Sequence, residues 1–197
     1  FENTMAEVLE LAGETGPLAL RRCLANSNML SSDVSAGFDP TFASVFEPKN
    51  SCYLGHGLTF NKYTGARGKS GSNDADAEYL ATIRRVMDEG GVHFQTAELG
   101  KVDAGGGGTI AYILATYGMN VVDCGVPVLS MHAPWEATSK ADVYEAYRGY
   151  QEFLMNEARY SRLTREFPER AEELFAENEQ AAMARWSHLQ KLKDLYA

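Results

Sequence analysis

The sequence predicts an α/β/α sandwich with a central mixed sheet, followed by a C-terminal helical extension. Short apolar, β-like runs alternate with helical patterns as far as about Tyr150. Beyond Gly149 the chain has none of its 18 glycines and becomes rich in Glu, Arg, Ala and Leu. We therefore expect two parts, an α/β part over residues 1–150 and a helical part over residues 151–197.

The elements of the α/β part follow from two kinds of pattern. Strands are expected where apolar residues run together and stop at turn residues, as the run ending near Val34 does before Gly37 and Pro40. Helices are expected where apolar residues recur every three or four positions. The patterns predict helices near residues 3–12, 17–25, 75–89 and 108–117, and strands near residues 28–34, 57–61, 92–97, 119–123 and 126–131.

The helical part is predicted to be a hairpin of two helices, residues 139–165 and 169–196. Pro168 suits the first position of the second helix, and Glu169 after it suits the helix dipole. An apolar stripe must then be covered by the other arm, by the α/β part or by a partner chain. The stripe consists of Phe175, Ala182, Trp186, Leu189, Leu192 and Tyr196.

Asp33 and His132 are the first candidate functional residues, because each follows an apolar run that reads as a strand. A histidine at the carboxyl end of a strand is well placed to act as a metal ligand or a base. A carboxylate and a histidine suit a first-row metal, although a zinc site needs about three protein ligands. The alternatives are a histidine that caps its strand and an aspartate that forms a turn.

A glycine run is the first candidate for substrate binding. Residues 105–108 are all glycine and precede a predicted helix, whose free amides can hold an anion or a carbonyl oxygen. Gly106 and Gly107 are therefore candidate substrate contacts. The run lacks the spacing of a nucleotide-binding loop. Tight packing between a strand and a helix is the alternative interpretation.

A cationic loop is the second candidate for substrate binding. Lys62, Arg67 and Lys69 lie close together in a chain whose formal net charge is -9. Cations in this arrangement can bind an acidic side chain or a terminal carboxylate of a substrate. The alternative is ordinary solvated loop charge.

The composition is that of a soluble globular protein that buries one sizeable core. Its negative charge argues against nucleic acid as the main partner. The sequence shows neither a membrane-spanning apolar run nor a signal-peptide pattern. Three cysteines without CxxC spacing favour reduced thiols and a cytoplasmic protein. His56, His93 and His188 have no ligand-like spacing and are expected to be structural or exposed.

Five blocks of sequence, in a fixed order, carry a resemblance to a known family. The blocks are residues 32–40, 46–50, 62–75, 97–109 and 130–136. Together they cover the two candidate metal ligands, the cationic loop and the glycine run. The chain from residue 1 to about 150 thereby resembles the aspartyl aminopeptidase family of dinuclear zinc exopeptidases, in its bacterial form.

This resemblance implies a metallo-aminopeptidase, which removes N-terminal residues from peptides with two zinc ions or another divalent metal. Asp33 would be the terminal carboxylate ligand of one metal, and His132 the terminal imidazole ligand of the other. In the family the metals polarise the scissile carbonyl and generate a hydroxide nucleophile. Members assemble into large homo-oligomers, so the resemblance also implies self-association.

The family pattern includes an early His, a bridging Asp and an adjacent Glu-Glu pair that supplies the general base. None of these is present here, so no catalytic base is assigned to this chain. We expect residues 1–150 to be the C-terminal half of the catalytic domain, with an incomplete, zinc exopeptidase-like sheet. The chain alone is predicted to be inactive unless another polypeptide supplies the missing half.

The helical part resembles a different family. Residues 153–160, 167–175 and 184–186 are similar to the C-terminal tail of pyruvate:ferredoxin (flavodoxin) oxidoreductase. Thiamine-diphosphate and iron–sulfur motifs are absent, so no oxidoreductase chemistry is implied. The junction near Gly149 suggests a fusion or a composite reading frame. Two alternatives to the peptidase therefore stay open, a non-catalytic α/β module that associates through its helical tail and a fusion that carries an oxidoreductase tail.

Overall fold

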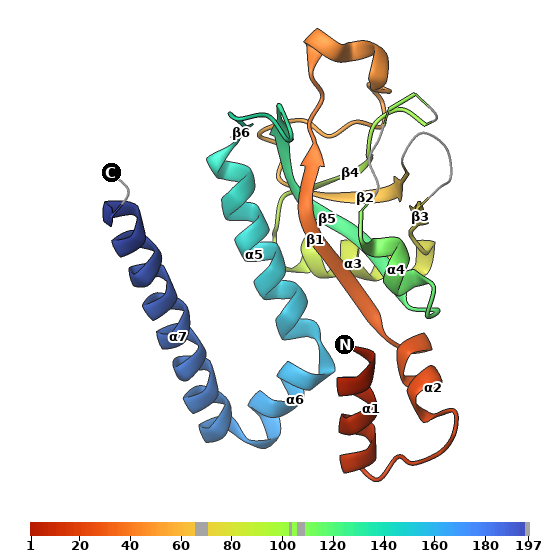
Figure 1. The fold of residues 1–197 in the computed structure, drawn as a ribbon, viewed down its shortest axis with the longest axis vertical. Coiled ribbons are helices and arrows are strands. Elements are labelled where there is room, and N and C mark those ends of the chain that lie inside the picture. Colours follow the sequence, from red (N-terminus) through yellow and green to blue (C-terminus); the bar gives the residue numbers. More distant parts are fainter. Residues whose placement is uncertain (66–70, 103, 106–108, 196–197) are drawn as a thin grey trace. The chain divides into compact units, whose positions relative to one another are not determined.

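The computed structural model describes residues 1–65, 71–102, 104–105 and 109–195, and the chain divides into two compact units, residues 1–150 and 151–197. The helices are α1 Glu2–Leu11, α2 Ala19–Ala25, η1 Pro40–Val45 (a 3-10 helix), α3 Ala77–Glu89, α4 Ala111–Ala115, α5 Lys140–Asn156, α6 Ala158–Glu166 and α7 Pro168–Leu195. The strands are β1 Asn28–Ala36, β2 Leu58–Thr64, β3 Asn73–Asp74, β4 Phe94–Glu98, β5 Asn120–Leu129 and β6 Ala137–Thr138 (Figure 1).

The first unit is built on a mixed sheet. β1 and β5 pair in parallel, as do β2 and β4, whereas β5 and β2 pair antiparallel. The two-residue strands β3 and β6 pair antiparallel with β2 and β5. The path β1-β5-β2-β3 thus carries β4 on β2 and β6 on β5 (Figure 1). This arrangement confirms the predicted central mixed sheet.

The apolar core of the first unit lies where β2 meets α3 and the first part of α5. Gly149 marks the close approach of α5, because a Cβ there would lie 2.8 Å from Leu58 Cδ2 and 3.2 Å from Met87 Sδ. Leu58 and Met87 are both fully buried. α3 begins at a regular cap, since the Asp76 carboxylate accepts the Tyr79 N–H at 2.8 Å.

β5 is one continuous strand, although the sequence predicts two strands, near 119–123 and 126–131. The apparent break falls at Gly125 and Pro127, two residues that usually interrupt strands. Gly125 is required here by a close approach, because a Cβ would overlap the Asp33 carbonyl oxygen. β2 pairs with β5 only from Asp123 to Gly125. The missing N–H of Pro127 therefore costs no bond on the β2 side.

Other boundaries also differ from the prediction. β1 continues to Ala36 and β2 to Thr64, while α4 has five residues where a helix over 108–117 is predicted. The short elements η1, β3 and β6 are missed, because two to six residues are too few to establish a hydrophobic period.

The helical part contains a break that the sequence does not reveal. The predicted first arm, 139–165, is interrupted at Glu157, whose backbone is extended with φ -70° and ψ 131°. In the second unit, α6 packs against α7, where the Tyr160 and Phe175 rings stack with centroids 6.5 Å apart. Trp186 and Leu189 of α7 are 56% and 50% exposed. Within the second unit, α6 therefore leaves much of the predicted apolar stripe uncovered.

None of the helices in the described part of the chain is both long enough and apolar enough to cross a membrane.

Candidate metal and substrate site

Asp33 lies inside β1, three residues before the strand ends at Ala36, and not at the strand end as predicted. The longer strand is explained by its parallel register with β5, which continues to Ala36 opposite Val128. The Asp33 side chain is exposed, and its Oδ1 accepts the N–H of Val34 at 2.7 Å. Its carboxylate is thus accessible to a ligand from outside the described sheet.

His132 lies in the loop that joins β5 to β6. Its backbone has φ 68°, and Ser130, two residues before it, has φ 58°. Both residues therefore adopt the left-handed backbone conformation that residues other than glycine rarely take. The Glu136 carboxylate accepts the His132 N–H at 2.6 Å, and the Ala133 N–H donates to Ser130 at 2.9 Å. Strain of this kind is concentrated at functional sites in proteins.

The two candidate ligands lie toward the same edge of the sheet. Because β1 and β5 are parallel, their carboxyl ends meet there, beside η1 (Figure 1). A cavity of about 270 Å³ lies at this edge, lined by Ala36, Gly37, Asp39, Phe42, Val45, Phe46, Val128, Ser130 and Met131. Among the described residues, however, no three His, Cys, Asp or Glu side chains come together as a metal site.

The predicted substrate contacts are only partly described. Lys62 forms an ion pair with Asp74 across the β2–β3 hairpin. A substrate anion would have to compete with that carboxylate for the ammonium group. The other four predicted contacts, Arg67, Lys69, Gly106 and Gly107, lie outside the described residues.

The described ends of the glycine-rich segment are fixed at two places. Before the glycine run, the Lys101 N–H donates to the Val45 carbonyl at 2.8 Å. After it, the Thr109 hydroxyl donates to Asp123 at 2.8 Å. The described chain resumes at Thr109, and α4 begins at Ala111. The binding of substrate by the glycine run stays a prediction.

Asp123 is a buried carboxylate that the sequence analysis did not single out. It is 2% exposed on β5, opposite Asn61 of β2 and Ser31 of β1. Burial raises the pKa of its carboxyl group, against the lowering effect of hydroxyl hydrogen bonds. A polar residue within an apolar run was the available signal.

Asp142 is a second buried carboxylate, in the first turn of α5. Its two oxygens accept the Gly55 N–H at 2.8 Å and the Gly57 N–H at 2.7 Å, so the loop before β2 is tied to α5. Its position near the N-terminus of α5 also suits the helix dipole. The role of Asp142 is to hold the fold together.

The cysteines differ in burial, and this difference predicts their reactivity. Burial raises the pKa of the Cys124 thiol to about 12 and also raises the pKa of Cys52, whereas Cys23 is half-buried. Because the thiolate is the reactive form, we expect Cys124 and Cys52 to alkylate at least ~100-fold more slowly than Cys23 in the folded chain. Mass spectrometry after timed iodoacetamide treatment measures this order, and equal rates in denaturant provide the control.

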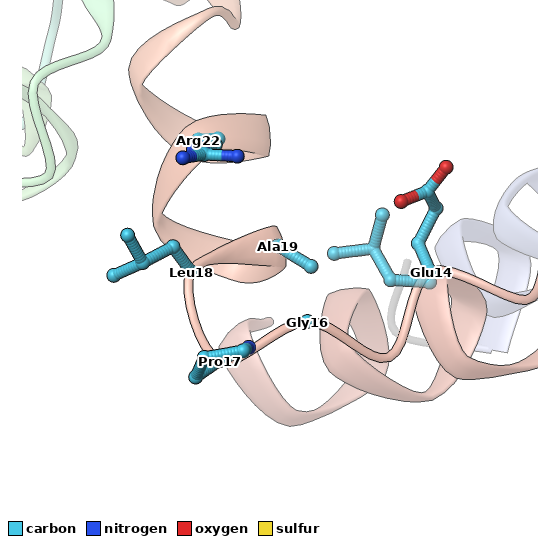
Figure 2. A pocket seen from close by; sticks show the side chains of 7 residues that line it. Glu14, Gly16, Pro17, Leu18, Ala19 and Arg22 are labelled. Atoms are coloured by element: carbon cyan, nitrogen blue, oxygen red, sulfur yellow. The ribbon is translucent and has the colours of Figure 1, made fainter.

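A cavity of about 350 Å³ lies in the turn between α1 and α2, away from the predicted site residues in sequence. Figure 2 shows the residues that line it, with Glu14 and Arg22 among those labelled. It contains none of the predicted metal or substrate contacts.

Comparison with known proteins gives the first unit clear relatives. Residues 1–154 match the family model described as aminopeptidase I zinc metalloprotease (M18). A probable M18 family aminopeptidase 1 from Clostridium acetobutylicum is 63% identical over 156 residues, which are 79% of this chain and 34% of that protein. Its counterpart from Thermotoga maritima is 43% identical over 155 residues, 78% of this chain and 34% of that protein. The chain thus spans about a third of the length of these relatives.

Solved structures agree with the sequence relatives. The crystal structure of aminopeptidase I from Clostridium acetobutylicum has a TM-score of 0.69 at 62% identity, over 79% of this chain and 33% of that one. The Thermotoga maritima aminopeptidase has a TM-score of 0.71 at 43% identity, over 77% and 34%. The Saccharomyces cerevisiae mApe1 dodecamer shares the fold, with a TM-score of 0.58 at 23% identity over 76% and 32%.

Proposed function

Since this chain belongs to the aminopeptidase I zinc metalloprotease (M18) family, we propose that it supplies part of the active site of a metallo-aminopeptidase. Such an enzyme hydrolyses N-terminal residues from peptides. Asp33 and His132 would hold zinc there, and bound zinc would supply Lewis-acid activation of the scissile carbonyl and of a water molecule. The observation that carries the proposal is the left-handed backbone of His132. His132 lies in the loop after β5, and β5 pairs with β1, the strand that bears Asp33.

Asp33 and His132 are the proposed metal ligands. A carboxylate and an imidazole are both donors that zinc accepts, but the described residues form no group of three such donors. The two-zinc site therefore requires further ligands and a general base from another segment. We propose that this segment corresponds to the part of the relatives that the chain does not span.

The substrate would be bound by the cationic loop and the glycine run. In this proposal Lys62, Arg67 and Lys69 contact an acidic group of the peptide, and Gly106 and Gly107 offer backbone amides to it. Lys62 is paired with Asp74, so in this proposal an acidic group of the substrate displaces the Asp74 carboxylate from the ammonium group.

The proposed partners are a peptide substrate and further copies of the same chain. Self-association is supported by the mApe1 dodecamer, which shares the fold. The negative net charge supports the absence of nucleic acid among its partners. The free cysteines, of which Cys52 and Cys124 are buried, support a cytoplasmic location.

Zinc content and hydrolysis by the purified chain test the proposed ligands. We expect substoichiometric zinc that falls further in the Asp33→Ala, His132→Ala double variant, because each ligand contributes to a site that lacks partners. We also expect no release of aniline from a panel of aminoacyl anilides. Chelator-sensitive hydrolysis that survives the double substitution would show that the ligand assignment is wrong.

A second candidate function concerns the helical part, which lies almost entirely beyond the family match that ends at residue 154. Met183, Trp186 and Leu189 are exposed on α7, which favours an association surface. The proposed resemblance of this part to an oxidoreductase tail would make it a segment of different origin. The oligomeric state of the full chain and of a chain truncated after residue 156 tests this role. An oligomeric full chain and a monomeric truncated chain would support association through the helical part.

A further inference from the structure

Asp123 links two segments of the first unit that are far apart in the sequence. Its Oδ2 atom accepts the Thr64 hydroxyl at 3.2 Å and the Thr109 hydroxyl at 2.8 Å. Thr64 is the last residue of β2, and Thr109 precedes α4. A single buried oxygen thus holds the end of a strand and the approach to a helix in one place.

The hydrogen bonds continue from each threonine to the backbone. The Thr64 hydroxyl accepts the N–H of Asn73 at 3.3 Å, which fixes the returning strand β3. The Thr109 hydroxyl accepts the N–H of Ala111 at 3.2 Å, which fixes the first residue of α4. A continuous path therefore runs from β3 through Asp123 to α4.

We propose that Asp123 is a positioning residue that fixes Thr64, at the end of β2, and Thr109, before α4, relative to each other. Lys62 precedes Thr64 by two residues in β2, and the glycine run ends immediately before Thr109. The relevance of this inference to catalysis rests on the proposed function, because the proposed substrate contacts lie in the segments next to Thr64 and Thr109. Asp123 itself touches neither proposed metal ligand through any hydrogen bond between described residues.

The chemistry of Asp123 fits positioning better than stabilisation. Its Oδ1 atom has no hydrogen-bond partner among the described residues. A buried carboxylate in this state costs stability that an apolar side chain would not, so packing alone does not account for it. Two charge-assisted bonds converging on Oδ2, in contrast, give a defined geometry to both segments.

Amide hydrogen exchange in the full chain tests this inference with two reporters, the N–H groups of Asn73 and Ala111. In Asp123→Ala we expect both to exchange at least ~10-fold faster than in the parent, beyond any change at Ile83 and Val86 of α3. Asp123→Asn should restore slow exchange, because its carboxamide oxygen can accept both hydroxyls. Asp142→Ala is the control for general destabilisation: it removes a buried carboxylate with no bond to either threonine, so it should accelerate exchange at the reporters and at α3 alike.

Equal acceleration at the reporters and at α3 would overturn the inference, because a purely structural residue would loosen the whole unit. If Asp123→Ala does not fold, Thr109→Val replaces it. Because the Thr109 hydroxyl itself accepts the Ala111 N–H, the reporter in this variant is Asn73, which is connected to Thr109 only through Thr64 and Asp123, and we expect its exchange to accelerate. Unchanged exchange at Asn73 in that variant would also overturn the inference. Exchange does not depend on hydrolysis, so this test can fail while the proposed peptidase function stands, and the reverse is equally true.

Discussion

Gly125→Ala should prevent stable folding of the first unit. A Cβ at this position would overlap the Asp33 carbonyl oxygen and approach Val34 Cα to 3.0 Å, so β1 and β5 could not pair in their observed register. Overpacking a core usually costs about 1–3 kcal/mol, and a clash with the rigid backbone of β1 should exceed about 4 kcal/mol. Urea unfolding followed by circular dichroism measures the loss.

The matched control for this substitution is Gly16→Ala. Gly16 has no atom within 4 Å of an added Cβ and no positive φ. The same methyl group there should change stability by no more than about 0.5 kcal/mol. A Gly125→Ala chain as stable as the Gly16→Ala chain would contradict the continuous β5 strand and its register with β1.

Asp142→Ala should be the second most damaging substitution. It leaves the N–H groups of Gly55 and Gly57 without an acceptor, and the Gly57 bond is buried. Each unpaired buried group costs about 1–3 kcal/mol, so we expect a loss of about 3 kcal/mol in the free energy of unfolding. The Tm should fall by about 10 °C in a chain of this size.

Asp88→Ala, on the exposed side of α3, is the control for loss of charge. It should lower Tm by no more than about 2 °C, because surface substitutions away from special contacts have small effects. Similar Tm values for the Asp88 and Asp142 variants would mean that the loop before β2 is not held by α5.

Much of the fold was readable from the sequence because long elements leave a period. The helices near 3–12, 17–25 and 75–89 and the strand starting at residue 28 correspond to α1, α2, α3 and β1. The sequence predicts two strands in place of β5 because Gly125 and Pro127 usually break strands. Whether a strand can accommodate them depends on its neighbours β1 and β2, which are distant in sequence. Tertiary context decided this element, and local propensity did not.

The candidate site divides in the same way. Asp33 and His132 were recognisable from short motifs and the turns that follow them, and their assignment as metal ligands stays a prediction. The ion pair between Lys62 and Asp74 depends on the β2–β3 hairpin, which was too short to predict. Asp123 was missed because its threonine partners lie 59 and 14 residues away.

Reconstitution of peptidase activity tests the central claim most directly. The purified chain would be mixed with the part of the Clostridium acetobutylicum aminopeptidase that it does not span, in the presence of zinc. We expect chelator-sensitive hydrolysis of aminoacyl anilides in the mixture and not with either component by itself. The activity should be lost when the chain carries Asp33→Ala or His132→Ala. A stable mixed complex without activity, or activity that survives both substitutions, would contradict the assignment of this chain as the metal-binding C-terminal part of an aminopeptidase.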